Sequence, residues 1–154
     1  SMGAGHMDKL VLSLAKKLPE RILLIALCGS NRRLAEKLQR HADGKKLLAL
    51  GFVDRLSDYM EAADIWLTKP GGLSTTEALH KGTPVLLFNA VQGVETRNLE
   101  FLTETGCCSS ADTIDGIAGC IRETIAACDL CPDGFDGLAC DRICKYILKK
   151  ELPE

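Results

Sequence analysis

Short apolar runs alternate with segments of helical periodicity along this chain. A continuous apolar run such as 21–28 is typical of a strand buried on both faces of a parallel sheet. The same pattern predicts further strands at 46–52, 65–68, 85–88 and, very short, 107–109. Helical periodicity predicts helices over 7–18, 31–42, 54–62, 73–82, 94–105, 112–127 and 136–149. Strands that alternate with helices indicate a doubly wound α/β domain with a parallel sheet between helical layers.

Composition limits the class of protein. The 154 residues, 46% of them hydrophobic, suffice for the core of one domain, which we predict to span 1–154. The 19 basic and 21 acidic residues are spread through the chain, and no basic stripe or aromatic ladder indicates a nucleic-acid surface. The sequence contains neither a run of 18 apolar residues nor a secretory signal pattern. These features predict a cytoplasmic domain without a nucleic-acid partner or a transmembrane segment.

The clearest site pattern is a strand, a glycine turn and a helix in the middle of the chain. Gly71 and Gly72 permit positive φ and let a ligand approach the backbone closely. Ser74 and Thr75 fall in the first helical turn, where unpaired N–H groups and the helix dipole favour a phosphate or diphosphate. Glu77, one turn further, can accept hydrogen bonds from sugar hydroxyls. The alternative is an ordinary strand-to-helix turn with hydroxyl caps.

Ligands of such sheets bind outside the carboxyl ends of the strands. Loops 29–31, 68–72 and 89–93 are predicted at those ends. The sequence has no G-x-G-x-x-G fingerprint, which argues against a dinucleotide. The loops therefore define one predicted binding edge.

Four of the eight cysteines, Cys128, Cys131, Cys140 and Cys144, have a spacing that four zinc ligands could share. However, Cys140 and Cys144 stand four residues apart in an apolar helical pattern, where a free cysteine behaves as a small hydrophobe. Without a secretory signal, disulfides are not expected either. We therefore favour core thiols and predict no metal site.

The first six residues, 1–6, have two interpretations. They are either the remnant of an expression tag or a native glycine loop that leads into the first helix. We favour the native loop. In that case the chain begins inside the domain, and the sheet lacks an edge strand or a central strand.

Several motifs occur in a fixed order across residues 20–106. They are Cys28-Gly29-Ser30-Asn31, then Gly51-Phe52-Val53 followed by Tyr59-Met60 and Ala63-Asp64, then Lys69-Pro70-Gly71-Gly72 with Glu77-Ala78, then Gly93-x-Glu95-x-x-Asn98. In these motifs the chain resembles the C-terminal half of glycosyltransferases of the GT-B fold. It is most similar to the group containing monogalactosyldiacylglycerol synthases, processive diacylglycerol glucosyltransferases and the lipid-intermediate N-acetylglucosaminyltransferase of peptidoglycan synthesis. The resemblance implies a Rossmann-like three-layer α/β/α domain, one half of a GT-B fold.

The resemblance also implies that this half binds a nucleotide-sugar donor, usually a UDP-sugar. The glycine turn and the first amides of the next helix would hold the diphosphate, and Glu77 would bind the ribose hydroxyls. Phe52 and Val53 would lie against the uracil, while Glu95 and Asn98 would face the sugar. The implied donor-binding set is Gly29, Asn31, Phe52, Val53, Gly71, Gly72, Ser74, Thr75, Glu77, Gly93, Glu95 and Asn98.

Some of these residues have structural alternatives. Asn31 could simply cap its helix. Glu95 could be a first-turn acid that the helix dipole favours. Glu77 could be a solvent-facing helix residue. These alternatives leave the glycine turn as the firmest element of the implied site.

The reaction implied by the resemblance is inverting transfer of a hexose from a UDP-sugar to a lipid acceptor such as diacylglycerol. The general base and the acceptor surface would belong to an N-terminal domain outside this chain, so no catalytic residue is assigned here. The chain alone is expected to be inactive and to need no metal or cofactor. The enzyme would be cytoplasmic, with peripheral contact at the inner face of the membrane. The alternatives are a non-catalytic UDP-binding module and one half of a UDP-sugar epimerase.

Overall fold

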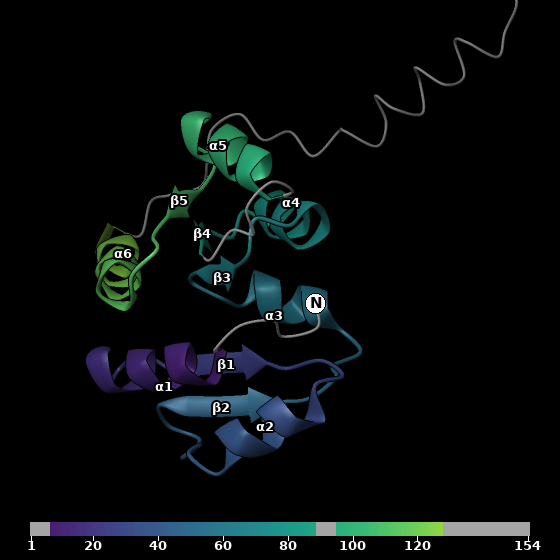
Figure 1. Ribbon diagram of the computed structural model, residues 1–154, viewed down its shortest axis with the longest axis vertical. Helices are drawn as coiled ribbons and strands as arrows, with labels where there is room; N and C mark the ends of the chain where they lie inside the picture. The colour runs from purple at the N-terminus through teal and green to yellow at the C-terminus, as the bar shows by residue number, and fades with distance from the viewer. Residues whose placement is uncertain (1–6, 89–94, 128–154) are drawn as a thin grey trace, which may run out of the picture.

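Helices and strands alternate along residues 7–88 and 95–127, the ranges that the computed structural model describes (Figure 1). The helices are α1 (Met7–Lys17), α2 (Arg32–Gln39), α3 (Leu56–Glu61), α4 (Gly72–His80), α5 (Thr96–Glu104) and α6 (Ile114–Ala127). The strands are β1 (Leu24–Leu27), β2 (Leu47–Leu50), β3 (Trp66–Thr68), β4 (Val85–Leu87) and β5 (Ser109–Ser110). The order of these elements confirms the α/β prediction, and the predicted helix 136–149 lies outside the described residues.

Most observed elements are shorter than their predicted ranges. The apolar run 21–28 forms a strand only from Leu24, because the backbone first turns where the Ile22 N–H donates to the Pro19 carbonyl at 3.0 Å. The last strand begins at Ser109, two residues later than predicted, after the Cys108 N–H has bonded to the Leu102 carbonyl of α5. Local hydrogen bonds at the ends of elements therefore shift the boundaries that hydrophobic periodicity predicts.

All strand pairs are parallel, as predicted, but within the described residues the sheet is in two parts. One part pairs β1 with β2, with Leu24 opposite Leu47. The other part has the order β3-β4-β5, with Trp66 opposite Val85 and Leu86 opposite Ser109. Every strand-to-strand connection within each part contains a helix, which is how parallel neighbours are joined.

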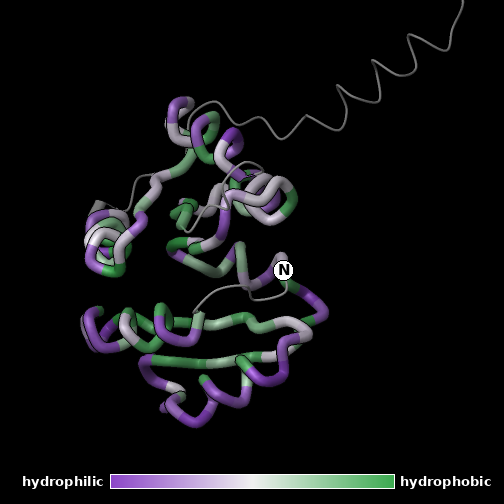
Figure 2. The backbone as a smooth tube through the Cα atoms, in the orientation of Figure 1, coloured by the Kyte–Doolittle hydropathy of each residue, from purple (hydrophilic) through white to green (hydrophobic). Residues whose placement is uncertain are grey.

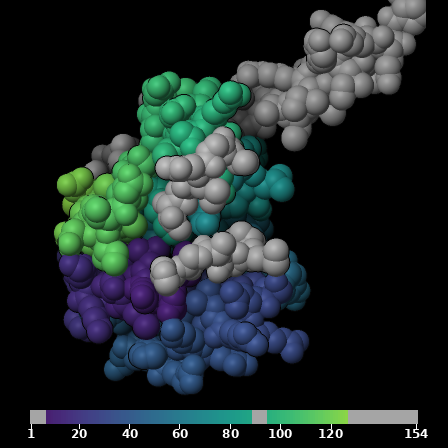
Figure 3. Space-filling view, in the orientation of Figure 1, coloured from purple at the N-terminus to yellow at the C-terminus, as the bar shows by residue number. Residues whose placement is uncertain are grey.

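One helical layer covers both parts of the sheet. Helices α1 and α6 lie side by side (Figure 3), and a core cluster joins them to Leu86 at the centre of β4. Its members are Leu14 of α1, Leu18 directly after α1, and Ile117 and Ile121 of α6. An ion pair between Lys17 and Asp115 joins the same two helices at the surface. Helix α2 continues the layer over β2, where Cys28, Ala35, Leu38 and Ala49 are buried together.

A second helical layer covers only the part of the sheet formed by β3, β4 and β5. Here α3, α4 and α5 pack on β3, β4 and β5 around a cluster that includes Met60, Ala78, Val85 and Leu87. The buried Thr83 hydroxyl donates to the Met60 carbonyl at 2.7 Å, which ties the loop before β4 to the end of α3. The described residues thus form the three layers expected of a doubly wound domain.

The prediction that the run 21–28 is buried on both faces is wrong. Leu23 is 44% exposed and Ile25 is 45% exposed, whereas the alternate residues Leu24 and Ala26 pack under α1 and α2. Side chains of a strand alternate between its two faces, so one face of β1 lies in the core and the other does not. Among the described residues, no core cluster reaches that second face.

Hydropathy follows this layering. Figure 2 shows mainly hydrophobic residues along β2 and mainly hydrophilic residues along α2, which packs outside it. In the described ranges no helix combines the length and the apolar character that crossing a bilayer requires.

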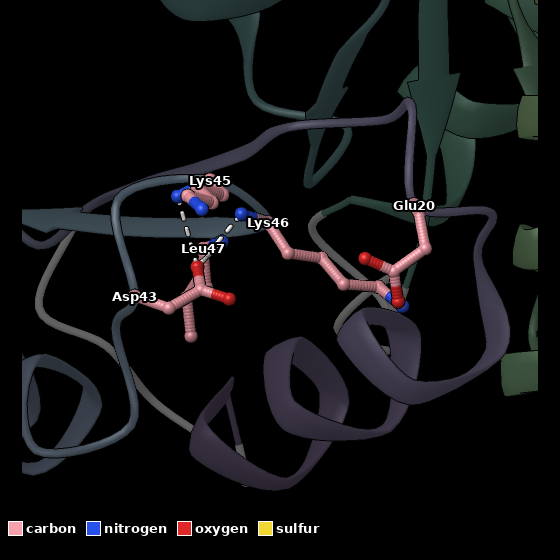
Figure 4. Close-up of polar contacts among 5 residues, drawn as sticks. All are labelled: Glu20, Asp43, Lys45, Lys46 and Leu47. Carbon is pink, nitrogen blue, oxygen red and sulfur yellow. Dashed lines mark hydrogen bonds and ion pairs between the residues drawn. The ribbon is translucent and has the colours of Figure 1, made fainter.

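A carboxylate organises the turn that leads into β2 (Figure 4). Asp43 Oδ1 accepts hydrogen bonds from the backbone N–H groups of Lys45 at 3.0 Å, Lys46 at 2.7 Å and Leu47 at 3.1 Å. These bonds, led by the one from Lys46, lower the pKa of the Asp43 carboxyl to about 2. Lys46 also pairs with Glu20, Nζ to Oε1, at 3.4 Å.

The lowered pKa predicts an acid-dependent loss of stability. The folded pKa of Asp43 is about 2 and the ordinary pKa of an aspartate is 3.8, so the ionised carboxylate stabilises the fold above about pH 4. This contribution is lost as the pH falls from about 4 to about 2. We expect Asp43→Asn, which keeps an acceptor oxygen but cannot titrate, to have a lower thermal midpoint at pH 7 and a flatter decline below pH 4.

The control for this prediction is Glu20→Gln. The Glu20 side chain is 93% exposed, and exposed ion pairs contribute little to stability. Thermal melts of the wild type and both variants between pH 7 and pH 2 are the measurement. An acid decline in Asp43→Asn as steep as in the wild type would contradict the assignment.

Candidate functional site

The glycine turn joins β3 to α4 and has an unusually bare backbone. Its first part is rigid, because Pro70 is buried and the Gly71 N–H donates to the Lys69 carbonyl at 2.7 Å. Gly71 has φ −86° and ψ 143°, and Gly72 begins the helix. The positive φ that the sequence allows at these two glycines is therefore not used.

What matters at these glycines is the missing side chain. Among the described residues, a Cβ built on Gly71 or on Gly72 would meet no heavy atom within 4 Å, so nothing in that part of the chain occupies the side-chain position of either glycine. Glycine at such a place lets a ligand approach the main chain closely. In the part of the chain that the structure describes, the two glycines thus leave the main chain of the turn open at the side-chain positions.

The N-terminus of α4 has unpaired donors. The first helical bond runs from the Thr75 N–H to the Gly71 carbonyl at 3.4 Å, so the N–H groups of Gly72, Leu73 and Ser74 precede the helical ladder. Gly71 at the N-cap position has no side chain with which to cap them. Three amides and the positive end of the helix dipole make this end of α4 suited to an anion.

Side chains from two helices hold the turn in place. The hydroxyls of Thr68 and Ser74 lie 3.1 Å apart, across the two ends of the turn. The Thr75 hydroxyl donates to the Lys69 carbonyl at 3.5 Å, and Asn98 Nδ2 on α5 donates to the Pro70 carbonyl at 3.2 Å. Sequence reasoning did not identify Thr68, and it placed Asn98 against the sugar. No sequence pattern predicts these hydrogen bonds, because Thr68 and Asn98 contact the turn only after folding.

The loops that follow β1 and β2 lie next to each other. Gly29 has φ +55°, and a Cβ built on Gly51 would lie 3.8 Å from the Gly29 carbonyl oxygen. Asn31 Oδ1 accepts the Leu34 N–H at 3.1 Å, so Asn31 caps α2. The structure thus shows the capping contact of Asn31, and its donor-binding role stays a prediction.

Three further predicted residues stand at exposed or half-buried positions. Phe52, in the loop after β2, is 77% exposed, and Val53 beside it is half-buried. Glu77 lies exposed on α4, one turn beyond the unpaired amides. An exposed phenylalanine and an exposed carboxylate at the carboxyl ends of the strands remain available to a ligand.

The fourth motif is described only in part. Gly93 lies outside the described residues. Glu95 is half-buried at the N-cap position of α5, where its side chain makes no capping hydrogen bond. Of this fourth motif, Asn98 contacts the glycine turn in the structure, through its hydrogen bond to the Pro70 carbonyl.

The cysteines in the described ranges are free thiols, buried or half-buried, as expected of thiols that pack in a core. Burial raises the pKa of the Cys28 thiol, and burial with neighbouring Cys107 raises the pKa of Cys108 to about 12. In the described ranges no three metal-binding side chains come together. The zinc hypothesis concerns Cys128, Cys131, Cys140 and Cys144, which lie outside those ranges.

Comparison with known proteins identifies the family. The sequence pattern of the glycosyltransferase family 28 C-terminal domain matches residues 1–108. The chain belongs to this family. The match confirms the resemblance inferred from the four motifs, and the parallel α/β layers agree with it.

Relatives of this glycosyltransferase family 28 domain are glycolipid enzymes by name. The chain is 35% identical over 108 residues to a processive diacylglycerol beta-glucosyltransferase of Bacillus subtilis, covering 68% of this chain and 28% of that protein. It is 37% identical over 106 residues to the enzyme of the same name from Bacillus pumilus, covering 62% and 27%. A probable chloroplastic monogalactosyldiacylglycerol synthase of Glycine max is 30% identical over 100 residues, covering 65% and 19%. The chain thus spans less than a third of the length of these relatives.

Proposed function

We propose that this domain binds the UDP-sugar donor of an inverting glycosyltransferase that transfers a hexose to a lipid hydroxyl, such as that of diacylglycerol. The observation that carries the proposal is the N-terminus of α4, which has no side-chain cap and begins with two glycines. Such a terminus suits the diphosphate of a nucleotide sugar. The names of the relatives support a glycolipid product.

The turn would assist the reaction electrostatically. When the bond from the sugar to the diphosphate breaks, negative charge grows on the departing diphosphate. The N–H groups of Gly72, Leu73 and Ser74 and the dipole of α4 would stabilise that charge without reorganising. Lys69, at the start of the turn, would add a cation.

The remaining contacts follow from the same placement. Phe52 and Val53, after β2, would lie against the uracil, and Glu77 would accept hydrogen bonds from the ribose hydroxyls. Glu95 would face the sugar. These positions stand at the carboxyl ends of parallel strands, where doubly wound sheets bind their ligands.

Catalysis would need a second domain. The chain spans 28% of the length of the Bacillus subtilis relative, and the general base and the acceptor surface would lie in another part of the protein. This domain alone would bind the donor and not transfer the sugar. The whole enzyme would contact the inner face of the membrane peripherally, because its acceptor is a lipid.

Glu77→Ala tests the nucleotide assignment. A hydrogen bond to a charged group contributes about 1.5–3 kcal/mol, so we expect UDP binding to weaken about 10- to 100-fold. The variant should bind 2′,3′-dideoxy-UDP as the wild type does, because that ligand has no ribose hydroxyl to lose. Calorimetric titration of both proteins with both ligands, and with ADP, is the measurement.

Glu123→Ala, which removes an exposed carboxylate from α6, is the matched control and should leave all affinities unchanged. Equal weakening for UDP and the dideoxy ligand would contradict the ribose contact. A wild-type chain that binds ADP as tightly as UDP, or binds neither, would contradict the proposed donor.

Asn98 provides a separate prediction about the turn. Its amide holds the Pro70 carbonyl, so Asn98→Ala should loosen the diphosphate site and weaken UDP and UDP-glucose by the same factor, about five- to tenfold. A side chain that only touched the sugar would instead weaken UDP-glucose alone. Titration with the two ligands separates these roles, and an unchanged UDP affinity in the variant would rule out the holding role.

A further inference from the structure

Charged side chains occur throughout the sequence but are divided unevenly in the fold. Residues 7–50, which contain α1, β1, α2 and β2, carry ten lysines and arginines against four acidic residues, a net charge of +6. The other described residues, 51–88 and 95–127, carry five basic and eleven acidic residues, a net charge of −6. The first group forms one side of the domain (Figure 1), so the two charges are also separated in space.

Part of this positive charge lies on the outer side of α1. Lys9 and Lys16 are both exposed and stand seven residues apart, about two helical turns, so they share one side of the helix. Helical periodicity puts that side roughly opposite Leu14, which is buried in the core cluster beneath the helix. The two lysines therefore point away from the sheet.

Helix α2 repeats this arrangement beside α1. Arg33 and the C-cap residue Arg40, which keeps a helical conformation, are exposed and again seven residues apart. They stand roughly opposite Leu38, which is buried against β2. Glu36 is an exposed acidic residue between them. The outer side of α2 is therefore also basic.

The two helices present these cations as one surface. Helices α1 and α2 pack against each other, and an ion pair between Asp8 and Lys37 joins them. We call the outer surface of the pair the basic face, and define it by Lys9, Lys16, Arg33 and Arg40. Within the described ranges these four side chains take part in no ion pair. Cations that gather without counter-charges create a positive potential, which attracts an anionic partner.

We propose that the basic face binds the headgroups of an anionic lipid bilayer. Lysine and arginine side chains are attracted to such a surface when they come within a Debye length of it. Residues 7–50 contain no phenylalanine, tyrosine or tryptophan on which bases could stack, which favours lipid over single-stranded nucleic acid. The choice of a bilayer also rests on the proposed function, because an enzyme with a lipid acceptor has to reach its substrate at a membrane.

A bilayer on the basic face would leave the donor site open. Helices α1 and α2 cover a face of the sheet, whereas the glycine turn stands at the carboxyl end of β3, at an edge of the sheet. With the basic face against the headgroups, that edge would open along the membrane surface. A lipid hydroxyl at the surface would then approach the donor from the side.

Vesicle binding tests the proposal. The 154-residue chain is titrated with vesicles of phosphatidylglycerol and phosphatidylcholine in equal parts, and with vesicles of phosphatidylcholine alone. We expect binding to the anionic vesicles only, and weaker binding at high salt, because salt screens exposed charges. Each lysine or arginine near an anionic surface contributes about fivefold to the affinity, so Lys16→Gln with Arg40→Gln should weaken binding about 25-fold.

The matched control is Arg55→Gln with Arg97→Gln. It also removes two exposed cations, one directly before α3 and one on α5, both in the other helical layer. Vesicle binding should not change in this variant. Equal binding to neutral vesicles, or an equal loss in both double variants, would overturn the proposal. A chain that binds a single-stranded oligonucleotide but not the anionic vesicles would assign the basic face to nucleic acid, and would also overturn it.

UDP titration separates this proposal from that of the donor site. Lys16 lies near the end of α1, shortly before β1 begins, and Arg40 follows α2, so both stand toward the amino ends of the strands. The Lys16→Gln, Arg40→Gln variant should therefore bind UDP as the wild type does, which would also show that it is folded. A wild-type chain that binds anionic vesicles but no UDP would contradict the donor proposal and leave the basic face supported.

Discussion

Gly72→Glu should strongly weaken nucleotide binding and raise the thermal stability of the domain at the same time. Gly72 is the first residue of α4, and a Cβ there meets no atom of the described residues within 4 Å, so the new side chain fits among them. An acidic residue in the first turn interacts favourably with the helix dipole, and replacing glycine lowers the entropy of the unfolded chain. Together these effects should raise the free energy of unfolding by about 1 kcal/mol. The carboxylate would occupy the diphosphate position and repel the ligand, weakening UDP at least about a hundredfold.

Thermal melts and UDP titration of the same preparation check both halves of this prediction. Gly119→Glu is the matched control, because a Cβ on this α6 residue also meets open space. It adds the same charge away from the turn and should leave the UDP affinity unchanged. If Gly72→Glu bound UDP as tightly as the wild type, the anion would not lie at the N-terminus of α4.

Leu86→Ala has the largest expected effect on stability. Leu86 is fully buried at the centre of β4, where α1 and α6 pack on the sheet. Removing a buried leucine loses its transfer free energy and leaves a cavity, so the free energy of unfolding should fall by about 3 kcal/mol. Urea denaturation of the wild type and the variant measures this difference.

Leu73→Ala makes the same substitution on the surface. Leu73 is 91% exposed on α4, so its loss should change the free energy of unfolding by less than about 0.5 kcal/mol. A similar destabilisation in both variants would mean that Leu86 does not lie in the main core. The pair thus tests the packing of α1 and α6 on β4.

Much of the fold could be predicted from hydrophobic pattern. The alternation of continuous apolar runs and segments of helical periodicity identified every described helix and strand, because both patterns reflect which side chains tend to reach the core. The pattern failed at the second face of β1, where Ile25 is apolar but exposed. An apolar side chain has a tendency to be buried, but its actual burial depends on whether another element packs against it.

The candidate site was predictable to a similar degree. Glycines before a helix indicate bare amides whatever the rest of the fold, and the structure has open space at Gly71 and Gly72. The capping role of Asn31 is also local, since it involves a residue three positions away. By contrast, Asn98 reaches the Pro70 carbonyl across 28 residues, and no local pattern encodes that contact.

The residues alone were enough to predict the order of elements, the glycine turn and the family, because these depend on short-range periodicity and on motifs within a few residues. The three-dimensional arrangement was needed to show that Asn98 bonds to the turn and that β1 and β3 do not pair with each other. Contacts between distant segments depend on which elements pack on the same core and which hydrogen-bonding groups they bring together. Packing in three dimensions decides this, and a local sequence pattern carries no information about it.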